Sequence, residues 1–149
     1  MMIGGVALLV LCPLGVGVLA AFLYGLTFAA APQLRSDGYV RGAMATFVQD
    51  GHQVASALFL FRDAGGASRT YQSVSQGYES DPAVADKGEL PGASNVRYVR
   101  LAKPINGRHV IAAYYTHNDL YGSVVYYSPD VVGPQMLTPY VSQQLALLT

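Results

Sequence analysis

The chain has 149 residues, with nine basic side chains balanced by nine acidic ones, so its formal net charge is zero. Nucleic-acid-binding surfaces carry a basic stripe, and this composition argues against a nucleic-acid partner. Cys12 is the only cysteine, which excludes an intramolecular disulfide and a metal site built on cysteines.

The N-terminal part of the chain is apolar from residue 3 to residue 31, and the first charged side chain is Arg35. About 20 helical residues cross a hydrocarbon core roughly 30 Å thick, whereas a helix in a water-soluble domain needs a polar face. We therefore predict a single N-terminal transmembrane anchor helix, 1–34, followed by a small extramembrane domain, 35–149.

Two kinds of processing compete with a permanent anchor. A secretory signal peptide would be removed after a small-residue site such as Ala29-Ala30-Ala31, but such peptides begin with a basic region that this chain lacks. A lipoprotein cysteine normally follows a small residue, whereas Cys12 follows Leu11. Both alternatives stay open beside the anchor.

Small residues recur at every fourth position of the apolar segment, which places them along one stripe of a helix. Close approach of backbones across small residues drives helix packing in lipid, although such residues are also common in membrane helices in general. We predict that this stripe is the helix-packing interface with other membrane protein subunits, while the rest of the anchor faces the lipid bilayer. The stripe consists of Gly17, Ala21, Gly25 and Ala29.

The orientation of the domain is only weakly marked in the sequence. Arg35 and Arg41 follow the apolar segment, and basic residues beside a membrane favour the cytoplasm. The remainder of the chain is poor in lysine and rich in tyrosine, as is common in domains outside the cytoplasm. We expect a single-pass membrane protein whose domain is extracytoplasmic.

The extramembrane domain begins with a predicted helix. Ser36 or Asp37 can cap this helix, and apolar residues follow at helical spacing as far as Gly51, which suits a C-terminal stop. The next two runs, 54–61 and 70–78, are predicted to be strands joined by a glycine-rich turn.

The second half of the domain reads as sheet and then helix. An irregular segment is predicted at 79–94, and further strands are predicted at 96–105, 108–117 and 123–128. Asn106-Gly107 is the strongest local signal, because both residues tolerate the positive φ of a two-residue type I′ turn. A closing helix begins at Thr138. The fold class is α+β, with an antiparallel sheet of about five strands and two flanking helices on one face.

The sequence nominates no catalytic residue, no cofactor site and no metal site. His109 and His117 lie eight residues apart on one predicted strand, which separates them by about 26 Å and is too far for a shared metal ion. The acidic side chains in the irregular segment lack the regular spacing of a calcium loop. No nucleophile elbow, phosphate-binding loop or metalloprotease motif is present. We therefore expect a protein that is not an enzyme.

Two tyrosine pairs occur on the last two predicted strands. Neighbouring residues of a strand point to opposite faces, so each pair places one ring on the outer face of the sheet. Tyrosine is enriched at protein interfaces, although it also favours strands in general. The predicted partner contacts are Tyr114, Tyr115, Tyr126 and Tyr127.

Three functions are compatible with these features. The first is a non-catalytic accessory, structural or assembly subunit of a larger membrane protein complex, and in layout alone the chain resembles import and oxidase-assembly factors. The second is a pilin-like filament subunit whose apolar N-terminal helix lies in the fibre core. The third is a membrane-tethered domain that binds a small ligand in a pocket beside the sheet. We expect the first.

Overall fold

The computed structural model describes residues 8–12 and 34–149, and its centre is an antiparallel sheet of seven strands. Six of these strands lie within 34–149, and the first comes from the N-terminal segment. In spatial order they are β1 (Leu8–Cys12), β2 (Tyr39–Gln49), β3 (His52–Phe61), β7 (Leu120–Ser128), β6 (His109–His117), β5 (Arg97–Leu101) and β4 (Val84–Glu89).

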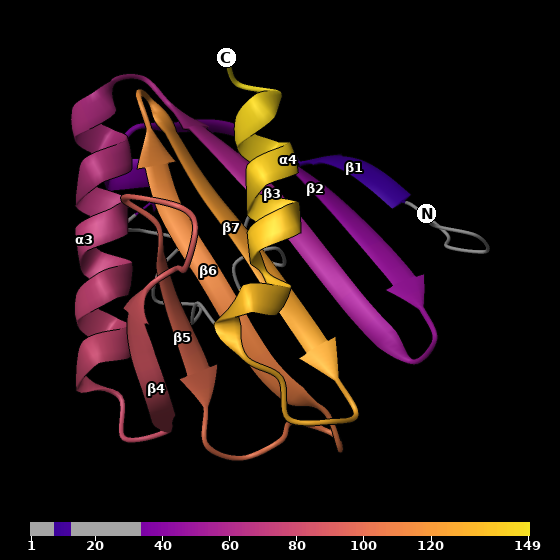
Figure 1. Cartoon of the computed structure of the whole chain (residues 1–149). Helices are drawn as coiled ribbons and strands as arrows, with labels where there is room; N and C mark the ends of the chain where they lie inside the picture. Colours follow the sequence, from indigo (N-terminus) through magenta and orange to yellow (C-terminus); the bar gives the residue numbers. More distant parts are fainter. Residues whose placement is uncertain (1–7, 13–33) are drawn as a thin grey trace.

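Helices cover both faces of the sheet. α3 (Ala64–Ser80) packs on one face, and α4 (Thr138–Ala146), preceded by the short 3-10 helix η1 (Pro134–Met136), packs on the other. In Figure 1, α4 lies in front of the sheet and α3 runs along its left side. The prediction of two helices on one face is therefore wrong, and the domain has three layers.

Each face of the sheet has its own hydrophobic core. The core under α3 contains Phe59, Tyr114 and Val125, and the core under α4 contains Ile111, Tyr115 and Val124. Each core also includes residues of the helix that covers it and of neighbouring segments. Alternate residues of β6 and β7 enter the two cores, because successive side chains of a strand point to opposite faces. The central strands β6 and β7 consequently bury most of their residues.

The predicted transmembrane helix is wrong in the part of 1–34 that the structure describes. Leu8–Cys12 is a strand, β1, which pairs antiparallel with β2 from Leu8 opposite Thr46 to Cys12 opposite Gly42. Within 8–12 and 34–149, no helix is both long enough and apolar enough to span a membrane. The predicted packing stripe (Gly17, Ala21, Gly25 and Ala29) lies outside the described residues.

The helix predicted after Ser36 is a strand, β2. Its apolar residues fit helical spacing, but the decisive signal is the turn that follows. Asp50 and Gly51 have φ angles of 50° and 78°, so they form a two-residue hairpin turn between Gln49 and His52 rather than the end of a helix. The Asp-Gly dipeptide thus joins β2 to β3, and the pairing continues along both strands.

The strand predicted at 70–78 is part of α3. Asp63 caps this helix, since its Oδ1 accepts a hydrogen bond of 2.8 Å from the amide of Gly66. The buried residues of α3 include Ala67, Thr70 and Val74, which recur at helical spacing. The segment predicted to be irregular, 79–94, also contains β4, so the predicted number of strands was too low.

The remaining predicted elements are confirmed with small shifts of their ends: β3, β5, β6, β7 and α4. Asn106 and Gly107 have φ angles of 51° and 76°, and Ile105 and Arg108 exchange backbone hydrogen bonds of 2.8 and 3.0 Å across them. This is the predicted hairpin turn. Thr138 begins α4 as predicted, and its hydroxyl donates to the carbonyl of Pro91 at 2.8 Å rather than capping the helix.

Buried polar contacts fix both helices. The Asp37 carboxylate, 2% exposed, accepts hydrogen bonds from Arg69 (3.1 Å) and from the Thr70 hydroxyl (2.9 Å) of α3. On the opposite face, the Gln144 side chain of α4 accepts from the Tyr115 hydroxyl at 2.7 Å and donates to Ser56 Oγ at 2.8 Å. These contacts satisfy groups that would be costly to bury without partners.

The start of α3 approaches the preceding loop so closely that only glycine fits. A Cβ atom on Gly66 would lie 2.0 Å from the backbone oxygen of Asp37, which no side-chain rotation relieves. Gly66→Ala should therefore lower the free energy of unfolding by about 1–3 kcal/mol. Thermal and urea unfolding of the full chain provide the measurement.

Gly77 of the same helix is the matched control. No described atom lies within 4 Å of a Cβ built at Gly77. Gly77→Ala should raise stability by about 0.5–1 kcal/mol, because alanine loses less backbone entropy in a helix. If both variants change stability in the same direction, the close approach at Gly66 is not the cause.

The hairpin turn at Gly107 offers a second test. Gly107 has positive φ, and no described atom lies within 4 Å of a Cβ built there, so a substitution acts through the backbone alone. Gly107→Val should cost about 1–3 kcal/mol of stability. Gly107→Asn should cost less, because asparagine tolerates positive φ. Equal melting temperatures for the two variants would contradict this account of the turn.

Candidate ligand pocket

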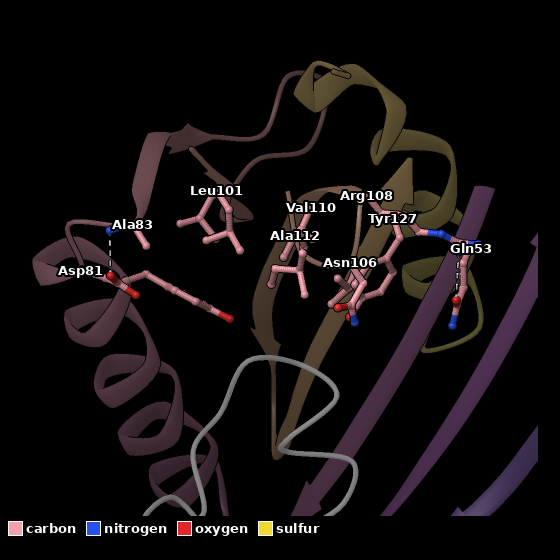
Figure 2. A pocket seen from close by; sticks show the side chains of 13 residues that line it. Gln53, Asp81, Ala83, Leu101, Asn106, Arg108, Val110, Ala112 and Tyr127 are labelled. Carbon is pink, nitrogen blue, oxygen red and sulfur yellow. Dashed lines mark hydrogen bonds between the residues drawn. The ribbon is translucent and has the colours of Figure 1, made fainter. Parts of the chain in front are cut away.

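A pocket of about 680 Å³ lies on the α3 side of the sheet, next to the end of that helix. Its volume is within the range of small-molecule sites, about 300–1,000 Å³. The described residues that line it are Gln53, Tyr78, Asp81, Ala83, Val99, Leu101, Ile105, Asn106, Arg108, Val110, Ala112, Val125 and Tyr127 (Figure 2).

The floor of the pocket is apolar and is built by strand alternation. Val99 of β5 lies opposite Ala112 of β6, and Ala112 lies opposite Val125 of β7, so these side chains form a row across three strands. Val110 lies opposite Tyr127 in a neighbouring row. All of them point to the α3 face, because cross-strand partners share a face of the sheet.

One end of the pocket is polar and carries a cation. Arg108 follows the Asn106-Gly107 turn, and Gln53 comes from β3, where it lies opposite Tyr127. The Arg108 Nη1 donates to Gln53 Oε1 at 3.4 Å, a long hydrogen bond. Figure 2 shows Asn106, Arg108, Tyr127 and Gln53 together on the right of the pocket.

The other end of the pocket carries a carboxylate. Asp81 follows the last turn of α3, and its Oδ1 accepts a hydrogen bond of 2.8 Å from the amide of Ala83. In Figure 2 these two residues lie on the left, and Val110 and Ala112 lie between them and the Arg108 end. The pocket therefore has an apolar middle with opposite charges at its two ends.

The tyrosines of the pocket remain neutral at physiological pH. Burial raises the pKa of Tyr78 far above its ordinary value, and the neighbouring Tyr114, Tyr127 and Asp81 act in the same direction. Burial also raises the pKa of the Tyr127 hydroxyl. Both groups can take part in hydrogen bonds as phenols, but neither is a base near neutral pH.

The predicted contact tyrosines lie on both faces of the sheet, and three of the four are buried within the domain. Tyr114 contacts α3, where its hydroxyl donates to Ser75 at 3.3 Å, and Tyr115 bonds to α4. The ring of Tyr126 lies 5.6 Å from that of His52. Only Tyr127 is half-buried, and it lines the pocket. Their contact with another protein stays a prediction.

The histidines and acidic residues that the structure describes do not come together as a metal site. His109 and His117 occupy the two ends of β6. Within 8–12 and 34–149, no group of three or more His, Cys, Asp or Glu side chains is arranged to hold a metal ion. Asp86 accepts a hydrogen bond from Tyr98 at 3.1 Å, and Glu79 pairs with Arg97 at 3.2 Å, so both acids are engaged in structural contacts.

The sequence contains two local signals for this pocket, but nothing in the sequence connects them. The valines and Ala112 recur at alternate positions of strands that were predicted, and the Asn-Gly turn was predicted immediately before Arg108. The missing step was the helix α3, since without it Tyr78 and Asp81 cannot be placed beside these strands. The sequence alone therefore does not identify the pocket residues as a set.

Comparison with known proteins finds a similar fold among solved structures. No protein family matches the sequence, and no curated protein matches it. Among solved structures, the chain is similar to the extracellular domain of PknH from Mycobacterium tuberculosis, with a TM-score of 0.54 and 13% sequence identity. The match covers 87% of this chain and 75% of that chain. At this level of identity the likeness establishes a similar fold and nothing further.

Proposed function

We propose that this protein is a non-catalytic binding domain outside the cytoplasm, which holds a small, largely apolar molecule in the pocket beside α3. The observation that carries the proposal is the pocket itself, with its floor of valine and alanine side chains and its polar ends. Sites for small molecules are typically concave and apolar with a few polar groups that orient the ligand.

The chemistry of the lining supports binding rather than catalysis. Among the described lining residues, the polar side chains are Gln53, Asn106, Arg108 and Tyr127 at one end and Asp81 at the other, and Tyr78 precedes Asp81 on α3. General acid–base catalysis needs a positioned group whose pKa lies near the working pH, and burial moves the pKa of Tyr78 away from that range. These groups are suited to orient a ligand through hydrogen bonds and charge.

The proposed location rests on two independent observations. The domain is poor in lysine and rich in tyrosine, and its fold is similar to that of a domain described as extracellular. The roles as accessory subunit of a membrane complex and as filament subunit stay predictions from the sequence. Among the described residues, no contact favours either of them over ligand binding.

The test is a binding measurement with a neutral apolar fluorophore, N-phenyl-1-naphthylamine, whose emission rises in apolar surroundings. The full chain is held in an amphipathic polymer rather than in detergent, because its segment 3–31 is apolar and detergent monomers would compete for the pocket. Ala112→Phe places a ring on the pocket floor, where about 680 Å³ of space can accept it. We expect the affinity to fall about tenfold or more, or about 1.4 kcal/mol.

Ala146→Phe is the matched control, because Ala146 is exposed on α4, on the opposite side of the sheet. This variant should bind the fluorophore as the unchanged protein does, and thermal unfolding should show that both variants remain folded. If Ala112→Phe binds as tightly as Ala146→Phe, the fluorophore does not occupy the pocket and the proposed function is wrong.

A further inference from the structure

The two ends of the pocket differ in charge, and this difference selects a ligand. Arg108 and Asp81 are the charged residues among the described lining residues. They come from different elements, the turn before β6 and the end of α3, and Figure 2 shows them on opposite sides of the apolar floor. A molecule with one charged group would therefore bind in one direction only.

Arg108 is available to an anionic ligand. The guanidinium is half-buried, and within 8–12 and 34–149 it forms no ion pair, since its hydrogen-bond partner is the neutral side chain of Gln53. Arginine presents a planar fork of donors that matches a carboxylate in a bidentate arrangement. Partial burial strengthens such a contact, because the local dielectric constant is lower than in water.

Asp81 disfavours the reverse orientation. Its carboxylate would repel an acidic group placed at its end of the pocket, and Ala83 already occupies one of its oxygens with a hydrogen bond. The row of Val99, Ala112 and Val125 between the two ends offers only apolar contact. A ligand that satisfies all three regions has an acid at one end and a hydrocarbon body.

We propose that the ligand class of this pocket is a single-chain apolar carboxylate whose acid group binds Arg108 and whose hydrocarbon chain lies over the β5–β7 floor. This inference rests on the proposed function, because it names the kind of molecule that the binding domain holds. Charge complementarity at Arg108 and repulsion at Asp81 assign the direction of binding.

The experiment compares decanoate with 1-decanol, two probes with the same chain length and different head groups. Calorimetric titration of the full chain in amphipathic polymer at pH 7 should give an affinity for decanoate at least about tenfold higher than for 1-decanol, as expected for a charge-assisted hydrogen bond. Arg108→Gln should remove this preference, because it should weaken decanoate binding much more than 1-decanol binding.

Three further variants complete the design. Arg41→Gln removes an exposed arginine outside the pocket and should keep the preference for decanoate. Arg108→Lys keeps the charge without the fork and should retain part of the preference. Asp81→Asn keeps an oxygen acceptor for Ala83 and should leave decanoate binding equal or tighter. Thermal unfolding of each variant checks that the domain is folded.

The outcomes separate the inference from the proposed function. If the unchanged protein binds 1-decanol as tightly as decanoate, or if Arg108→Gln weakens both probes equally, the inference is overturned while apolar binding stands. If neither probe binds and N-phenyl-1-naphthylamine does not bind either, the proposed function itself fails. A decanoate preference that Arg108→Gln abolishes and Arg41→Gln leaves intact supports both.

Discussion

Burial of strands β6 and β7 on both faces is the constraint on which the layered arrangement of the described domain depends. Ile111, Ala112 and Ala113 are consecutive and all buried, at 0, 8 and 0% exposure, which requires a layer of protein on each side of the sheet. α3 supplies one layer and α4 the other. A buried hydrogen bond joins α3 to Asp37, and another joins α4 to Tyr115 of β6. The pocket lies beside the end of α3, over the floor formed by β5–β7.

The sequence predicted correctly those elements that carry a specific local signal, such as a turn or a helix start. The Asn-Gly turn fixed the hairpin of β5 and β6, and the Thr138-Pro139 start with Val141 and Gln144 at helical spacing identified α4. β2 was predicted as a helix and part of α3 as a strand, because the apolar residues of both segments fit the spacing of a helix as well as that of a strand. The turn at Asp50-Gly51 and the cap at Asp63 decide between them, and both depend on backbone geometry that composition does not reveal.

The candidate site was harder to predict than the fold, because it is assembled from segments that are distant in sequence. Arg108 and Asp81 belong to different elements, and nothing in either local sequence indicates that they face one apolar floor. For the same reason, the sequence does not decide which member of each tyrosine pair is the inner one. Tyr115 is part of the interior once α4 is placed, whereas from the sequence alone either member of the pair can be the outer one.

The order of strands also affects how the chain reaches its native state. β3 pairs with β7, from Leu60 opposite Leu120 to Gln53 opposite Tyr127, so the whole of α3, β4, β5 and β6 lies between two strands that must meet. Such non-local pairing slows folding, because the entropy of closing a long loop is lost before the contacts form. The hairpins β2–β3 and β6–β7 can form early, but the sheet is continuous only when they join. A chain emerging from the ribosome therefore cannot complete its central sheet until β7 has been synthesised, and until then β3 presents an unpaired edge.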